Sequence, residues 1–148
     1  MQELFNRAGI PNEVIEPAKG RGSFIARLGS GTRKLLFLSH LDVVPAEGSW
    51  DFDPFSGEIT NNYVCGRGAL DCKGLTSAQA WALIRLAREG VILNGELIMV
   101  ASADEEMGGS LGIKYLAEKY PRKLLADFAI NEGADLPIAF NGKNIFFI

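Results

Sequence analysis

The sequence predicts a domain of the α/β class. Short apolar runs alternate with amphipathic stretches along all 148 residues, a pattern typical of strands and helices that succeed one another through a sheet. The composition is 47% hydrophobic and 22% charged, which is ordinary for one globular domain with a sizeable core. No internal repeat, low-complexity tract or long linker interrupts the alternation.

The first half of the chain predicts strands and a hairpin. Residues 24–28 have the pattern of a half-exposed strand, and residues 34–39 contain the unbroken apolar run of a buried strand. Residues 57–60 and 63–66 flank an Asn-Asn pair, which tolerates the positive φ of a tight turn. We therefore expect the last two segments to pair with each other.

The second half predicts helices between further strands. Residues 74–89 are apolar except for one charged stripe, so we expect a largely buried helix with Trp81 in the core. The elements expected after it are a strand at 96–103, a helix at 110–120, a strand at 127–131 and a hairpin at 137–148.

Charge and cysteine content exclude several classes of function. The formal net charge is −3, and no stretch concentrates Lys and Arg, so we expect neither a nucleic-acid partner nor a membrane surface. No apolar run is long enough to span a bilayer, and the N-terminus lacks a signal sequence, so we expect a cytoplasmic protein. Cys65 and Cys72 do not have the spacing of a zinc knuckle and are interpreted as free thiols.

Three of the apolar strands run directly into side chains that can bind a metal. Carboxyl ends of strands in an open α/β sheet meet where ligands bind. Because crowded carboxylates repel one another, such a cluster requires a cation, and a divalent metal would supply it. The residues are His40 and Asp42 after the first strand, Asp104 to Glu106 after the second, Glu132 after the third, and Asp71 before the long helix.

Each of these features also has an ordinary structural explanation. A histidine at a strand end is commonly a satisfied surface residue, and an Asp-Glu-Glu run is commonly a solvated loop. Cys72 is either a soft zinc ligand or, more commonly for such a residue, a buried inert thiol. Residues 66–71 superficially match a glycine-rich dinucleotide turn, but Asp71 replaces the last glycine and would repel a pyrophosphate.

Taken in order, four motifs give the chain a family resemblance. They are Ser-His-Leu-Asp-Val-Val-Pro at 39–45, Gly-Arg-Gly-Ala-Leu-Asp-Cys-Lys-Gly at 66–74, Ala-Asp-Glu-Glu-Met-Gly-Gly at 103–109 and Asn-Glu-Gly at 131–133. The chain resembles the dinuclear-zinc metallopeptidase family of the aminoacylases, carboxypeptidase G, acetylornithine deacetylase and succinyl-diaminopimelate desuccinylase. The likeness extends from about Gly22 onward.

The resemblance implies a fold and a set of residue roles. The fold would be a three-layer domain with a mixed, mainly parallel sheet flanked by helices. Two Zn²⁺ ions, or Co²⁺ as a substitute, would be bound. His40 and Glu132 would bind one ion, Glu106 the other, and Asp71 both; Glu105 would be the general base, Asp42 would orient the imidazole, and the Asp71–Cys72 peptide bond would be cis. We expect Glu105 and Glu106 on an extended segment, where neighbouring side chains point to opposite sides.

The resemblance also implies what lies outside the chain. Family members are considerably longer, so we expect residues 1–148 to be the N-terminal portion of a catalytic domain whose dimerisation or lid domain and C-terminal portion are absent. The parent protein would be a homodimer acting on an N-acyl amino acid or a short peptide. The alternative is a non-catalytic metal-binding fragment, or half of a split enzyme that needs a second chain.

Overall fold

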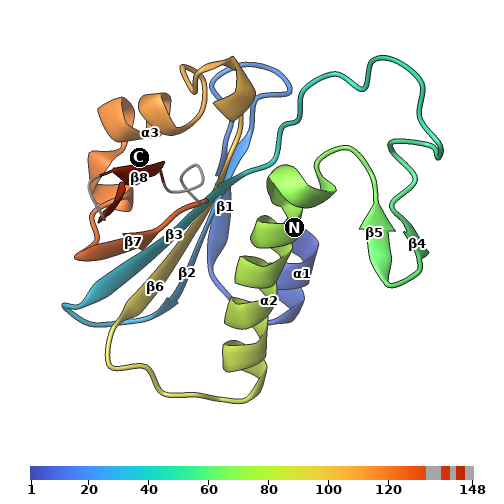
Figure 1. Ribbon diagram of the computed structural model, residues 1–148. Helices are drawn as coiled ribbons and strands as arrows, with labels where there is room; N and C mark the ends of the chain where they lie inside the picture. The colour runs from blue at the N-terminus through green and yellow to red at the C-terminus, as the bar shows by residue number, and fades with distance from the viewer. Residues whose placement is uncertain (133–137, 141–142, 146–148) are drawn as a thin grey trace.

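The computed structural model describes residues 1–132, 138–140 and 143–145 of the chain. Within them, five strands form one sheet in the order β1-β2-β6-β3-β7 (Figure 1). Strands β3, β6 and β7 are parallel, whereas β1 and β2 join antiparallel, so the predicted mixed sheet is confirmed. The strands are β1 (Asn12–Ile15), β2 (Ser23–Gly29), β3 (Lys34–His40), β6 (Glu96–Ser102) and β7 (Phe128–Ile130).

Helices cover both faces of this sheet, which confirms the three-layer prediction. Figure 1 shows α1 (Gln2–Arg7) and α2 (Gly74–Arg88) on one side and α3 (Ile113–Lys119) on the other. The central strand β6 is apolar from Leu97 to Ala101 because each face packs against a different core. Met99 and Ala101 belong to the cluster that includes helix α2, and Ile98 and Val100 belong to the cluster that includes α3.

Helix α2 is less buried than the sequence predicts. Trp81, expected in the core, is 57% exposed, and the guanidinium of Arg88 lies over its ring at 5.8 Å. Only the stripe of the helix that faces the sheet is covered, and Trp81 lies beside that stripe. The buried residues of the helix are Thr76, Gln79, Leu83 and Ile84.

Two elements differ from the predicted pattern. Strand β1 (Asn12–Ile15) was not predicted, because its short run lies between prolines and carries little hydrophobic alternation. Helix α3 begins at Ile113 instead of residue 110, because the preceding backbone is bound elsewhere: the carboxylate of Asp104 accepts the N–H of Leu111 at 3.0 Å. Pro121 then starts the 3-10 turn η3 (Pro121–Lys123).

The two predicted hairpins are represented by separate two-stranded sheets. Strand β4 (Glu58–Thr60) pairs with β5 (Tyr63–Cys65), and the linking Asn61 and Asn62 have φ of 48° and 66°, as expected. Strand β8 (Ile138–Phe140) pairs with β9 (Lys143–Ile145). The other residues of the hairpin predicted at 137–148 lie outside the described residues.

Both cysteines are free thiols, as predicted. Within the described part of the chain, no helix has the length and apolar character needed to cross a membrane.

Candidate metal centre

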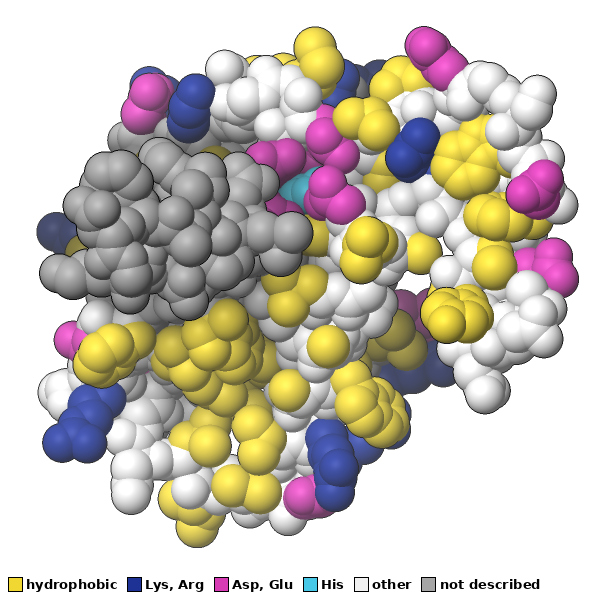
Figure 2. All heavy atoms as spheres, in the orientation of Figure 1, with side chains coloured by type: hydrophobic (Ala, Val, Ile, Leu, Met, Phe, Trp, Pro, Cys, Tyr) yellow, Lys and Arg dark blue, Asp and Glu magenta, His cyan; other side chains and the backbone are white. Residues whose placement is uncertain are grey.

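The predicted acidic residues meet at one edge of the sheet because β3, β6 and β7 run in the same direction. His40 is the last residue of β3, Glu105 lies in the 3-10 turn η2 (Glu105–Met107) after β6, and Glu132 follows β7. Asp71 comes from the helical turn η1 (Ala69–Lys73) that precedes α2. Figure 2 shows acidic side chains gathered around the single histidine on this rim.

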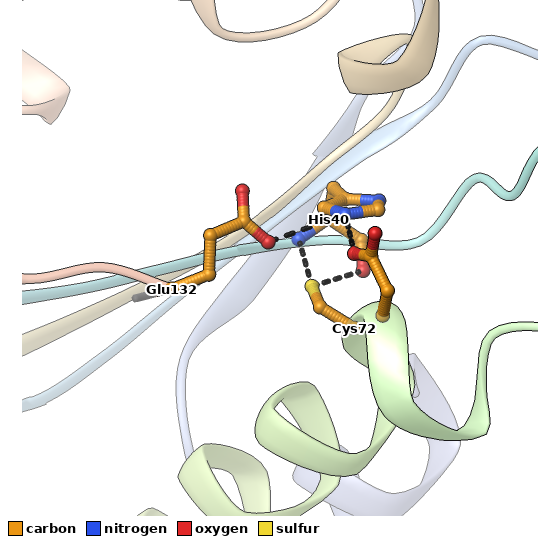
Figure 3. Close-up of side chains that lie close together, drawn as sticks. His40, Cys72 and Glu132 are labelled. Carbon is orange, nitrogen blue, oxygen red and sulfur yellow. Dashed lines mark hydrogen bonds and ion pairs between the residues drawn. The ribbon is translucent and has the colours of Figure 1, made fainter. Parts of the chain in front are cut away.

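The imidazole of His40 is the centre of the cluster. Its Nε2 lies 2.9 Å from Asp71 Oδ1, 3.2 Å from Glu132 Oε2 and 3.8 Å from Glu105 Oε2. The ring itself is almost fully buried, and Figure 3 shows Glu132 reaching it from a segment different from that of Cys72. Even when the imidazole is protonated, its single Nε2–H can serve only one of the three carboxylates well, so the others remain without a compensating charge.

The other ring nitrogen fixes the tautomer that suits a metal ligand. Nδ1 of His40 lies 3.0 Å from the main-chain oxygen of Asp42, which can only accept, so Nδ1 carries the hydrogen. The lone pair of Nε2 then faces the carboxylates when the imidazole is neutral. The Asp42 carboxylate is farther from the ring, at 3.6 Å from Nδ1. Asp42 thus contacts the imidazole mainly through its carbonyl.

The carboxylate of Asp42 binds the backbone of η2. It accepts the N–H of Glu105 and the N–H of Glu106, both at 3.1 Å. The extended segment expected for Glu105 and Glu106 is therefore wrong: the pair lies on a 3-10 turn. Since the turn curls both glutamates back toward β3, Glu105 and Glu106 share a cluster with His40 and do not point to opposite sides of the chain.

Burial and crowding shift the protonation of the cluster. Burial lowers the pKa of His40, but the hydrogen bond with Asp71 and the charges of Glu132 and Glu105 outweigh it, so the pKa is raised. Burial also raises the pKa of Glu105; the charge of His40 opposes the rise, and neighbouring carboxylates add to it. The raised pKa of His40 thus reflects the carboxylates around it, whereas the raised pKa of Glu105 reflects mainly its burial.

Cys72 is a protonated thiol in this environment. Burial raises its pKa to about 11, because hydrogen bonding to the backbone of His40 only partly offsets the loss of solvent. Its Sγ accepts the N–H of His40 at 3.2 Å. Of the two explanations open for Cys72, this geometry favours the buried inert thiol. The peptide bond between Asp71 and Cys72 is cis, as the resemblance implied.

Two groups of side chains in the described residues can hold a metal. Each group offers ligand atoms that lie within 4.8 Å of one another, and His40 belongs to both. Imidazole nitrogen with carboxylate oxygens is the ligand type that zinc and other divalent metals accept, so the residues present fit such an ion. One group is His40, Asp71, Cys72 and Glu132; the other is His40, Glu105 and Glu106.

The cluster opens into a cavity of about 560 Å³. Asp71, Glu105 and Glu132 supply its charged wall, while Leu70 and Leu75 supply an apolar one. Leu70 is 95% exposed even though it directly precedes a predicted ligand. The cavity is large enough for a small polar molecule with an apolar substituent.

Asp104 does not take part in the cluster although it stands in the predicted acidic run. Its φ is 66°, which turns its carboxylate inward, where it accepts the N–H of Leu111 and faces Arg21 at 3.4 Å. The pairing of Asp104 with Arg21 was not predicted from the sequence. A basic residue just before the first predicted strand was the only available signal.

The family described as "Peptidase family M20/M25/M40" matches residues 36–141. A succinyl-diaminopimelate desuccinylase of Methylocella silvestris is 43% identical over 83 residues, covering 55% of this chain and 21% of that protein. A probable succinyl-diaminopimelate desuccinylase of Staphylococcus aureus is 33% identical over 121 residues, covering 80% of this chain and 30% of that protein. The chain therefore spans less than a third of these relatives.

Solved structures with a similar fold include a member of the same family. A family M20 metallo-carboxypeptidase of Sulfolobus solfataricus superposes with a TM-score of 0.77 at 31% identity, over 91% of this chain and 31% of that chain. Human carnosine dipeptidase 1 superposes with a TM-score of 0.74 over 91% of this chain and 32% of that chain. Its identity of 22% makes it a likeness of fold alone.

Proposed function

This chain belongs to peptidase family M20/M25/M40, and we propose that it supplies the metal-binding part of a hydrolase that cleaves the amide bond of an N-acyl amino acid or a short peptide. One observation carries the proposal. Three carboxylates from three separate segments converge on Nε2 of His40, at 2.9, 3.2 and 3.8 Å. Such an arrangement is costly unless a cation is bound between the groups.

The proposed metal complement is two Zn²⁺ ions, with Co²⁺ as a possible substitute. His40 and Glu132 would hold one ion, Glu106 would hold the other, and Asp71 would bridge them with its two carboxylate oxygens. Support comes from the ligand chemistry and from the two overlapping groups of side chains centred on His40. When bound, such a pair of ions polarises the scissile carbonyl and lowers the pKa of a water.

Glu105 is the proposed general base. Its side chain lines the cavity and its carboxylate is part-exposed, so a substrate can reach it. Its raised pKa brings the carboxyl closer to the range in which one group can take a proton from water and then pass it to the departing amine. Its backbone N–H is bound by Asp42, so the residue that contacts the imidazole also anchors the base.

The reaction class rests on the names of similar proteins. The relatives named as desuccinylases and the structure named as a metallo-carboxypeptidase support a substrate with an amide bond next to a carboxylate. We further propose that residues 1–148 correspond to the N-terminal portion of the catalytic domain. The homodimeric parent and the cytoplasmic location stay predictions.

A zinc titration of the chain, followed by calorimetry, tests the proposal. We expect binding that His40→Ala abolishes and that Asp51→Ala, a change in an exposed acid outside the cluster, leaves intact. In parallel, hydrolysis of N-succinyl amino acids is compared with hydrolysis of dipeptides. Equal zinc binding by His40→Ala and the unaltered chain would contradict the proposed site.

The alternative is a metal-binding fragment without catalysis of its own, or half of a split enzyme. The observation in its favour is that the chain covers only 21% and 30% of two similar desuccinylases. Zinc binding without turnover is expected under both readings, because residues 1–148 alone, as one portion of a catalytic domain, are predicted to be inactive. Turnover that appears only after a second chain is added supports the split enzyme, and turnover by the chain alone rules out both forms.

A further inference from the structure

The edge of β3 that faces β7 is longer than β7 itself. The pairing of the two strands ends at Phe37 and Ile130, three residues before β3 ends at His40. On the opposite edge the ladder continues, since His40 is opposite Ser102 and the N–H of Leu41 binds the Ser102 oxygen at 2.8 Å. The last backbone groups of β3 on the β7 side therefore need other partners.

Two side chains of α2 and one from the segment just before it provide those partners. Gln79 Nε2 donates to the oxygen of Leu38 at 3.3 Å, and Cys72 Sγ accepts the N–H of His40 at 3.2 Å. Thr76 Oγ1 lies 3.1 Å from the oxygen of His40. Thr76 and Gln79 are three residues apart and therefore lie on one face of α2, whereas Cys72 lies in the non-helical backbone just before the helix begins at Gly74. All three are buried.

These bonds tie two proposed metal ligands together. Cys72 directly follows Asp71, and its thiol sulfur accepts a hydrogen bond from the backbone N–H of His40 (Figure 3). The Thr76 hydroxyl lies between two carbonyls, that of His40 at 3.1 Å and that of Cys72 at 3.2 Å, so its one hydrogen serves both segments. The side chains thereby link the segment of the imidazole to the segment of the Asp71 carboxylate.

We propose that Thr76 and Cys72 are positioning residues that set the separation between the imidazole of His40 and the carboxylate of Asp71, and through it the affinity of the site for a metal. The inference rests on the proposed function, because it assumes that these two groups bind one ion. Neither Thr76 nor Cys72 needs to contact the ion in this role. Each acts on the main chain that carries a ligand.

The test replaces the hydroxyl of Thr76 in the whole chain and measures the binding of Co²⁺ alone. Thr76→Val keeps the shape of the side chain and removes the donor, whereas Thr76→Ser keeps the donor. We expect Thr76→Val to weaken Co²⁺ binding by about 10- to 100-fold and to change the visible absorption spectrum of the bound ion. Thr76→Ser should restore both the affinity and the spectrum of the unaltered chain.

A control variant separates positioning from general stability. Ile84→Val trims a buried side chain of the same helix outside the proposed site, so it should lower the melting temperature without changing the Co²⁺ spectrum. If Thr76→Val does not fold, Cys72→Ala provides the same comparison, because it removes the acceptor for the His40 N–H.

The outcomes decide between the two proposals. Unchanged affinity and spectrum in the folded Thr76→Val or Cys72→Ala chain overturn the positioning role and leave the proposed function standing. The same spectral change in Ile84→Val also overturns it, since the effect would then be one of stability. Failure of the unaltered chain to bind Co²⁺ overturns the positioning role together with the proposed function.

Discussion

Asp42 and Glu105 are joined by a hydrogen bond from the backbone N–H of Glu105 to Oδ1 of Asp42, 3.1 Å long. Because the carbonyl of Asp42 also binds the ring of His40, one residue joins the imidazole to the turn that carries the proposed base. The neighbouring N–H of Glu106 binds the second oxygen of the same carboxylate. The Asp42 carboxylate therefore holds the acidic turn η2 through the main chain of the turn.

Asp42→Asn should loosen this turn. An amide keeps one accepting oxygen and turns an NH₂ group toward the other backbone N–H, so one of the two bonds is lost. We expect faster hydrogen exchange at the amides of Glu105 and Glu106, and about 10- to 100-fold weaker metal binding. Asp53→Asn is the matched control, because Asp53 Oδ1 accepts the N–H of Phe55 in a distant loop. Equal exchange rates in both variants would count against the anchoring role.

Glu105→Gln should separate binding from chemistry. The amide cannot take up a proton, so hydrolysis by a catalytically competent form of the protein should fall by about 10²- to 10⁴-fold. Zinc content should remain that of the unaltered protein. The comparison is Glu89→Gln, which changes an exposed glutamate that directly follows α2 and is paired with Arg85. Activity within about tenfold of the parent would exclude Glu105 as the base.

The metal-free chain should lose stability as the pH rises. The pKa of His40 is raised in the folded protein, so protonated His40 contributes to the free energy of unfolding. This contribution is fully present below the pKa of the unfolded chain, 6.5, and is lost as the pH rises through the pKa of the folded protein. The pKa of Glu105 is also raised in the folded protein, so Glu105 likewise lowers the stability as the pH rises above 4.5, the pKa of the unfolded chain. Urea unfolding with a chelator should therefore show lower stability at pH 8 than at pH 6.

Added zinc should reverse that trend, because a bound cation replaces the protons that the cluster loses. The gain in stability from zinc should be larger at pH 8 than at pH 6. His40→Gln should reduce both the stability that the metal-free chain loses between pH 6 and pH 8 and the stability that zinc adds. A metal-free chain whose stability rises between these two pH values would contradict the assigned shifts.

Cys72 should resist alkylation in the folded chain. Its pKa of about 11 leaves little thiolate at pH 8, and the thiol is buried. Cys65 is only half-buried and should react first with iodoacetamide. Mass spectrometry of the two tryptic peptides measures the rates, which should converge in urea. Faster labelling of Cys72 than of Cys65 in the folded protein would be inconsistent with this environment.

The sequence was informative where a property repeats along the chain. The buried run of β3 and the alternation in α3 follow from hydrophobic spacing, so these elements were predicted to within a few residues. The meeting of His40, Glu105 and Glu132 was also predictable, because parallel strands bring their carboxyl ends to one edge.

The remaining features depend on contacts between distant segments. The exposure of Trp81 depends on how far α2 is rotated against the sheet, and the inward carboxylate of Asp104 depends on Arg21 and on a positive φ. Likewise, the His40 N–H donates to Cys72 Sγ at a point on β3 beyond its pairing with β7. The composition of the chain and the spacing of its residues carry no information on these contacts between distant segments.

Strand β7 has a consequence for how fast an ion is exchanged. Within the described residues, β7 lies at the border of the sheet, is three residues long with all three residues exposed, and pairs with β3 at three positions. Glu132 comes two residues after the end of β7. Local separation of β7 from β3 would therefore move this proposed ligand away and leave His40 and Asp71 in place. Local opening of this kind requires far less free energy than unfolding. We therefore expect the lifetime of the bound metal to follow the fraying of β7, and the stability of the whole domain to have little influence on it.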